Sequence, residues 1–141
     1  MAVYLLDVNV LVALAWPVHS AHGLAGRWFG RHGDRGWATC PMSQAGLVRI
    51  LSNRAFSPDA LPLAQALQVL RRNVALPGHQ FWGDSIGLLE ALKLTSAPLG
   101  GHQQITDAYL VALAIHNRGK LATLDRKIAQ IAPTGAVEVI G

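Results

Sequence analysis

Short apolar segments alternate along this chain with segments whose apolar residues have helical spacing, and this alternation limits the fold more than any other feature. The apolar segments lie at residues 3–7, 37–40, 79–82, 120–124 and 136–140. Strands that alternate with helices are typical of α/β folds with a largely parallel sheet. We therefore expect a three-layer α/β/α sandwich with a central, mainly parallel sheet, formed by one domain of residues 1–141.

Spacing and end residues predict the helices. They are expected at residues 20–33, 41–53, 57–73, 84–94 and 107–117. Ser57 as N-cap and Pro58 at the first helical position predict one helix start, and Asp84 or Ser85 another. Thr106 is expected to cap the last helix. Residues 96–104, between two of these helices, are expected to form a loop.

The composition favours a compact protein of a reducing compartment. Of the residues, 51% are apolar and 14% are charged, which excludes a disordered chain. A single cysteine, Cys40, permits no internal disulfide, so we expect a cytoplasmic protein. Asp7 and Asn9 interrupt the first apolar run, and the run at 108–115 is too short to span a bilayer, so neither a signal peptide nor a membrane span is expected. The net charge of +4 fits an anionic partner such as nucleic acid, or an ordinary solvated surface.

Three of the eight acidic residues stand at the ends of predicted apolar elements: Asp7, Asp107 and Asp125. Ligands of open α/β sheets bind beyond the carboxyl ends of the strands, where these side chains can converge. Each acid also has a simpler interpretation. Asp107 fits a helix start and Asp125 fits a cap for residues 126–131, but Asp7 interrupts an apolar run, which is costly unless the charge is paired or bound to metal.

Convergence of three carboxylates predicts a divalent cation. Oxygen ligands of this kind select Mg²⁺ or Mn²⁺. In a basic protein such a site indicates phosphodiester chemistry, because the cation lowers the pKa of a bound water and neutralises charge on the phosphate. Two motifs for competing chemistry are absent: the sequence has no HExxH and no GxxxxGK[ST].

Four segments resemble the PIN-domain family and, within it, the VapC-like toxins of bacterial toxin–antitoxin pairs. They are "YLLDVNVLVAL", "WATCPMSQAGLVRIL", "ITDAYLVALAI" and "LATLDRKI", in the family's order. The resemblance implies a metal-dependent ribonuclease whose acids, here Asp7, Asp107 and Asp125, bind Mg²⁺ or Mn²⁺. It also implies a homodimer, a VapB-like antitoxin that covers the active site, and structured RNA targets such as tRNA or rRNA.

One position departs from the family pattern. Gln44, after Ser43, stands where the family usually has Glu, and a glutamine offers a carbonyl oxygen but no charge. Either the three acids bind the metal while Gln44 positions a water in the catalytic site, or the site has lost metal affinity and the chain is a PIN-fold module that binds RNA or a partner. A third reading, an aspartyl-phosphate phosphatase, lacks the second Asp that it needs, because Asn9 stands there.

Further residues are expected to support the site. Asn9, placed two residues after Asp7 on the same strand face, is expected to orient an acid or a water. Ser43, Thr106 and Thr123 are candidates for the same role, although Thr106 also fits a helix cap and Thr123 a strand. Candidates for RNA binding, which fit a solvated face equally well, are Arg49, Arg54, Arg126 and Lys127.

Overall fold

The computed structural model describes residues 2–95 and 99–141, and its centre is a parallel sheet. The sheet has five strands in the order β3-β2-β1-β4-β5, and every neighbouring pair is parallel. The strands are β1 (Tyr4–Leu6), β2 (Trp37–Thr39), β3 (His79–Phe81), β4 (Lys120–Thr123) and β5 (Val137–Val139). The expected parallel α/β fold is confirmed.

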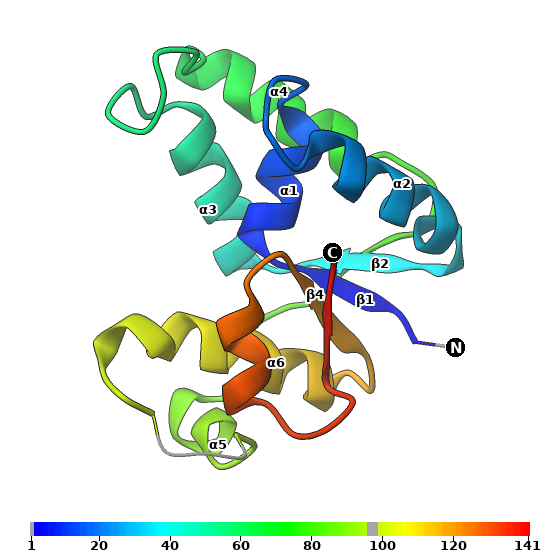
Figure 1. Ribbon diagram of the computed structural model, residues 1–141, viewed down its shortest axis with the longest axis vertical. Coiled ribbons are helices and arrows are strands. Elements are labelled where there is room, and N and C mark those ends of the chain that lie inside the picture. Colours follow the sequence, from blue (N-terminus) through cyan, green and yellow to red (C-terminus); the bar gives the residue numbers. More distant parts are fainter. Residues whose placement is uncertain (1, 96–98) are drawn as a thin grey trace.

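Helices cover both faces of this sheet (Figure 1). One face carries α1 (Val8–Ala15), α2 (His22–His32), α3 (Pro41–Leu51) and α4 (Leu63–Val74). The other carries α5 (Leu88–Leu92) and α6 (Ile105–His116). Three short 3₁₀ helices complete the described elements: η1 (Gly33–Arg35), η2 (His102–Gln104) and η3 (Arg126–Ile131).

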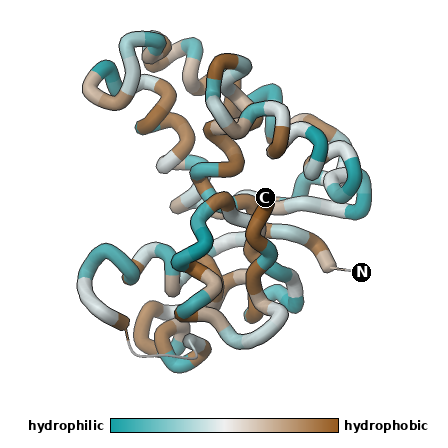
Figure 2. The backbone as a smooth tube through the Cα atoms, in the orientation of Figure 1, coloured by the Kyte–Doolittle hydropathy of each residue, from teal (hydrophilic) through white to brown (hydrophobic). Residues whose placement is uncertain are grey.

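The central strands β1 and β4 are largely apolar because their successive side chains enter two different cores. Leu5 packs in the core with α6, and Leu6 packs in the core with α1 and α3. Leu121 and Ala122 of β4 divide between the two cores in the same way. A strand buried on both faces lacks the polar alternation of a half-exposed strand. Figure 2 shows hydrophobic residues along α1 and the C-terminal strand, which pass through the middle of the molecule.

The first apolar segment is divided between a strand and a helix, which corrects the placement of Asn9 on a strand. Strand β1 ends at Leu6, and Asp7 caps α1, with its Oδ1 accepting a hydrogen bond of 2.7 Å from Val8 N. Aspartate is a favoured N-cap residue, so the carboxylate itself starts the helix. Asn9 therefore lies in the first turn of α1.

The predicted helix start at Ser57 is wrong, because α4 begins only at Leu63. Ser57 Oγ does accept a hydrogen bond from Asp59 N (3.1 Å), but it closes a turn instead of a helix. Pro62 explains the difference, since a proline has no N–H to donate inside a helix and disfavours helical geometry at the residue before it. The helix starts directly after this proline.

Two other predicted caps are also wrong. Helix α5 begins at Leu88, after Gly87, so neither Asp84 nor Ser85 caps it. Helix α6 begins at Ile105 without a side-chain cap, and Thr106 lies inside its first turn. The 3₁₀ helix η2, within the expected loop 96–104, leads directly into α6, so no extended residue is available at the helix start. Residues 96–98 of that loop lie outside the described residues.

Close packing of α1 against α3 fixes the segment that follows Asp7. A Cβ atom at Gly46 of α3 would lie 2.7 Å from Val8 Cγ2, so only glycine allows this approach without a shift. None of the helices in the described part of the chain has the length and hydrophobicity needed to span a membrane.

Candidate active site

Strands β1 and β4 bring Asp7 and Thr123 together at the carboxyl edge of the sheet. Leu6 pairs with Ala122, so the next residues of both strands lie beside each other. Asp7 N donates to Ala122 O at 2.9 Å, which holds the Asp7 backbone against β4. The exposed fraction of Asp7 is 6%, and Thr123 is fully buried. The sheet register therefore places a buried carboxylate against a buried hydroxyl.

The Thr123 hydroxyl connects three parts of this edge. It donates to Asp7 Oδ2 at 2.7 Å and accepts from Asn9 Nδ2 at 3.2 Å and from Asp125 N at 3.0 Å. Asn9 Oδ1 in turn accepts from Leu124 N at 3.1 Å. One hydroxyl thus orients the Asp7 carboxylate and ties the residues after β4 to α1.

Asp107 and Asp125 reach the same place from α6 and from the loop after β4. A cavity of about 310 Å³ is lined by all three acids together with Asn9, and we call it the carboxylate cavity. Asp125 Oδ1 accepts from Lys127 N at 2.9 Å, so Asp125 does cap η3 as its simpler interpretation predicted. No side-chain hydrogen bond in the described part of the chain uses the Asp107 carboxylate, which leaves it available to a ligand.

The three acids disfavour one another's charge. Burial and the charges of Asp7 and Asp125 raise the pKa of Asp107 to about 6. Burial also raises the pKa of Asp7, against the hydrogen bonds from Thr123 and Val8, and the charge of Asp125 adds to this rise. Carboxylates that share a site without a compensating cation behave in this way. The electrostatics of the cavity therefore favour binding of a positive ion.

The donor set fits Mg²⁺ or Mn²⁺, which prefer carboxylate oxygens. Within residues 2–95 and 99–141, no three His, Cys, Asp or Glu side chains are grouped closely enough to hold an ion by themselves. Magnesium usually takes only one or two carboxylates and keeps several waters, so acids spread around a cavity are compatible with it. Candidate ligands are Asp7, Asp107 and Asp125.

Comparison with known proteins agrees with this geometry. The PIN domain family model matches residues 4–133. The chain belongs to the PIN-domain family. It is 42% identical over 136 residues to ribonuclease VapC39 of Mycobacterium tuberculosis, which covers 96% of this chain and 98% of that protein. Ribonuclease VapC38 of the same organism is 40% identical over 140 residues, 96% of each chain. The resemblance to VapC-like PIN domains is confirmed.

Solved structures show the same PIN fold at low sequence identity. The structure of VapC20 from M. tuberculosis, described as a sarcin–ricin loop cleaving toxin, matches with a TM-score of 0.71 at 14% identity, over 98% of this chain and 99% of that one. VapBC2 from Rickettsia felis, bound to a promoter DNA fragment, matches with a TM-score of 0.69 at 14% identity, over 99% of both chains. Because the curated relatives are named ribonucleases, a module without catalytic activity is not favoured.

Gln44 of this PIN domain lies in α3 and is held by a hydrogen bond. Its Nε2 donates to Thr39 Oγ1 at 2.9 Å, and the same oxygen lies 2.7 Å from His79 Nε2. Gln44 also lines a groove between α3 and α4, together with Arg49, whereas the lining of the carboxylate cavity does not include it. The sequence did not indicate the contact with Thr39 and His79, because it depends on the pairing of β2 with β3.

The other two polar candidates, Ser43 and Thr106, both lie in the first turn of a helix. Ser43 is fully buried, and its Oγ accepts from Cys40 N at 2.9 Å and donates to Cys40 O at 3.1 Å. These bonds close the first turn of α3, so Ser43 stabilises the helix start. Thr106 is exposed in the first turn of α6 and makes no side-chain hydrogen bond among the described residues.

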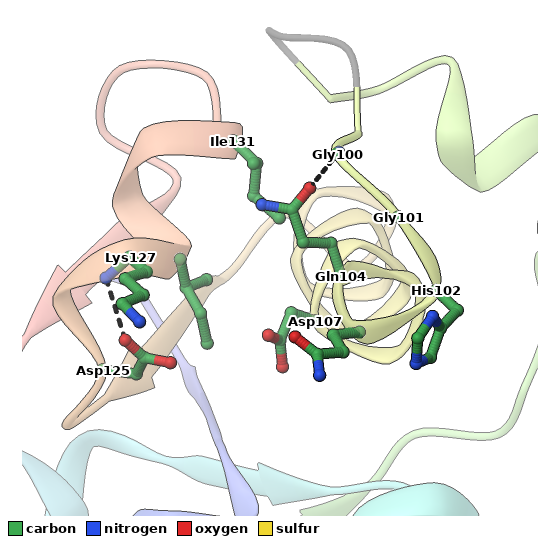
Figure 3. A pocket seen from close by; sticks show the side chains of 10 residues that line it. Gly100, Gly101, His102, Gln104, Asp107, Asp125, Lys127 and Ile131 are labelled. Carbon is green, nitrogen blue, oxygen red and sulfur yellow. Dashed lines mark hydrogen bonds between the residues drawn. The ribbon is translucent and has the colours of Figure 1, made fainter.

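Of the basic candidates, Lys127 lies nearest the acids. It lines a second cavity, which Asp107 and Asp125 also line (Figure 3). Arg126 is exposed on η3, whereas Arg49 and Arg54 are exposed on and after α3. The structure therefore brings one basic candidate to the cavities beside the acids and leaves the arginines on the surface.

Proposed function

We propose that this PIN domain, taken as one unit of residues 1–141, is a Mg²⁺- or Mn²⁺-dependent endoribonuclease toxin that hydrolyses phosphodiester bonds in structured RNA. The observation that carries the proposal is the meeting of Asp7, Asp107 and Asp125 on one cavity, where burial and the charges of Asp7 and Asp125 raise the pKa of Asp107 to about 6. The names of the curated relatives, ribonucleases VapC39 and VapC38, support the same activity.

In this proposal Asp7, Asp107 and Asp125 would hold the cation. A bound Mg²⁺ or Mn²⁺ would supply positive charge to the phosphate and favour ionisation of water near neutral pH. Thr123 fixes the orientation of Asp7 through its hydrogen bond to Oδ2, and Asn9 supports Thr123 from α1. Hydrolysis adds water across one phosphodiester bond, and Lys127 would contact the phosphate as the RNA enters.

In this proposal Gln44 does not bind the cation but positions a water in the catalytic site. Its amide donates to Thr39 Oγ1, and this bond would hold the side chain while it positions a water in the catalytic site. The three remaining acids would be sufficient for activity. Gln44→Glu would then remove the hydrogen bond that the amide donates to Thr39 without adding a necessary ligand.

The proposed protein partners rest on the resemblance to VapC-like toxins and on a groove between α3 and α4. A groove of about 500 Å³ between α3 and α4 is mainly apolar, with Val48, Leu63, Leu67 and Leu70 in its lining. Such a surface supports binding to a VapB-like antitoxin or to a second copy in a homodimer. The RNA target would be a tRNA or an rRNA, cut in the reducing cytoplasm that the single, unpaired Cys40 fits.

The test is cleavage of purified bacterial total RNA by the antitoxin-free protein. We expect discrete products with Mg²⁺ or Mn²⁺ and none with EDTA, because EDTA removes the cation that would neutralise the phosphate and favour ionisation of water. Asp7→Ala serves as the inactive control. Equal cleavage by wild type and Asp7→Ala, or equal cleavage in EDTA, would contradict the proposal.

A further inference from the structure

The second cavity beside the acids is larger than the carboxylate cavity and has different walls. It measures about 620 Å³, and Figure 3 shows Asp125 and Lys127 on one side of it and Asp107, Gln104 and His102 on the other. We call it the side cavity. It shares Asp107, Asp125 and Ile128 with the carboxylate cavity, so the two cavities are neighbours. Its volume is within the roughly 300–1,000 Å³ that is usual for small-ligand sites.

Away from the acids, the side cavity is neutral and partly apolar. Ile128 and Ile131 of η3 lie behind one wall of it, and since their exposed fractions are only 2% and 4%, small parts of the two side chains face the cavity. Gly100 and Gly101 face it without side chains, and a Cβ atom at Gly101 would meet no other atom within 4 Å. An apolar wall beside open backbone suits a flat ring better than a second phosphate, which would require cations.

Charge is confined to the end of the side cavity near the acids. Lys127 is the one Lys or Arg among the described residues that line it. Its ammonium group is in no ion pair within the residues that the structure describes. A nucleotide has a charged phosphate at one end and a neutral base at the other. The side cavity has the same order, with a cation next to the acids and a neutral wall beyond it.

Gln104 contributes a side-chain amide to the neutral wall. Its Oε1 accepts from Gly100 N, which fixes the amide plane and ties the loop to the start of α6. The Nε2 atom, in contrast, has no partner in the described part of the chain, and Figure 3 shows the Gln104 amide near Ile131. Single-stranded bases are recognised by packing and by hydrogen bonds to their edges.

We propose, on the basis of the nuclease function above, that the side cavity binds the unpaired nucleobase next to the cleaved phosphodiester. The base lies against the open backbone of Gly100 and Gly101, beside Ile128 and Ile131. Its edge accepts a hydrogen bond from Gln104 Nε2, and Lys127 contacts the adjoining phosphate. Gln104 is then a specificity-determining residue, and the substrate is RNA with an unpaired nucleotide at the cleavage site.

Nucleotide binding tests this proposal without cleavage. The four ribonucleoside 5′-monophosphates and inorganic phosphate would be titrated into wild-type protein in EDTA, with the backbone amide NMR signals of Gly100 and Gly101 as readout. We expect at least one nucleotide to shift both signals and to bind at least about tenfold more tightly than phosphate. In Gln104→Glu the acceptor for Gly100 N remains but the donor is lost, so affinity for that nucleotide should fall about tenfold.

Gln130→Glu is the matched control, because it makes the same change of charge at an exposed position of η3 that does not line the cavity. It should bind as wild type does. Four nucleotides that bind no better than phosphate, or equal binding by Gln104→Glu and wild type, would overturn the proposal. The RNA cleavage assay separates the two claims: cleavage without nucleotide binding overturns only the base site, and nucleotide binding without cleavage overturns only the nuclease.

Discussion

Asp107→Asn is expected to reduce RNA cleavage by about 10³-fold or more and, at the same time, to stabilise the metal-free protein. The loss of activity follows from removal of one of the carboxylates that would hold the cation, because the cation supplies positive charge at the phosphate and losses of about this size follow when such an electrostatic contribution is removed. The gain in stability follows from the pKa of Asp107, which lies near 6 against 3.8 for an unperturbed group. Activity and stability should therefore change in opposite directions.

The pH dependence of this gain has a definite sign. Below pH 3.8 the carboxyl group is protonated in both states and contributes nothing. Between pH 3.8 and about 6 the unfolded chain loses this proton first, so the free energy of unfolding falls as the pH rises. Above pH 6 the loss is complete, and since the group is half-exposed we expect it to be only about 1 kcal/mol, or roughly 4 °C in Tm.

Thermal unfolding in EDTA at pH 4 to 8, beside cleavage in Mn²⁺, measures both effects. The control is Asp59→Asn, the same chemical change in an exposed turn away from both cavities. It should leave cleavage and the pH profile unchanged. An Asp107→Asn protein with full activity, or with a lower Tm than wild type at pH 7, would contradict this account of the site.

Thr123→Val is expected to produce the largest loss of stability among the site variants. Valine has nearly the shape of threonine, but it cannot donate to Asp7 or accept from Asn9 and Asp125. Each buried group left without a partner costs about 1–3 kcal/mol, so we expect a total near 3 kcal/mol. The hydrogen bond from Thr123 also lowers the pKa of Asp7, so its loss should raise that pKa further and reduce cleavage about tenfold or more.

Thr123→Ser separates the hydroxyl from the methyl group. Serine keeps the hydroxyl and should retain most of the activity, with a loss of about 1 kcal/mol for the missing methyl group. Urea unfolding and initial cleavage rates would be compared for the two variants. If Thr123→Val is no less stable than Thr123→Ser, the hydroxyl does not hold the site together.

The strand positions could be predicted because a short apolar run in the sequence is enough to indicate a buried strand. The central strands β1 and β4 are short, largely apolar and mostly buried, and the acid that ends β1 lies at the carboxyl edge of the sheet. Asp7 could be placed for this reason. Asn9 could not, because an apolar run that is buried on all sides is equally compatible with a strand and a helix. The hydrogen bond from Val8 N to Asp7 caps a helix at this point, so Asn9 is helical.

Contacts between distant segments were not predictable from one sequence. Ser57 and Pro58 form a good helix start when considered alone, but Pro62, four residues later, moves the start of α4 to Leu63. The contact between Thr39 and His79, made by the same hydroxyl that accepts from Gln44, depends on the pairing of β2 with β3. The wall that Gln104 contributes to the side cavity lies in a region without periodic spacing, so no sequence pattern indicated it.

The most direct test of the central claim is to locate a divalent ion in crystals of the protein grown or soaked with Mn²⁺. Anomalous scattering at the manganese edge should give one strong peak between Asp7, Asp107 and Asp125, and the peak should be absent from Asp107→Asn crystals. A wild-type crystal with no peak at these acids, or with its peak elsewhere, would contradict the claim that they form a metal site.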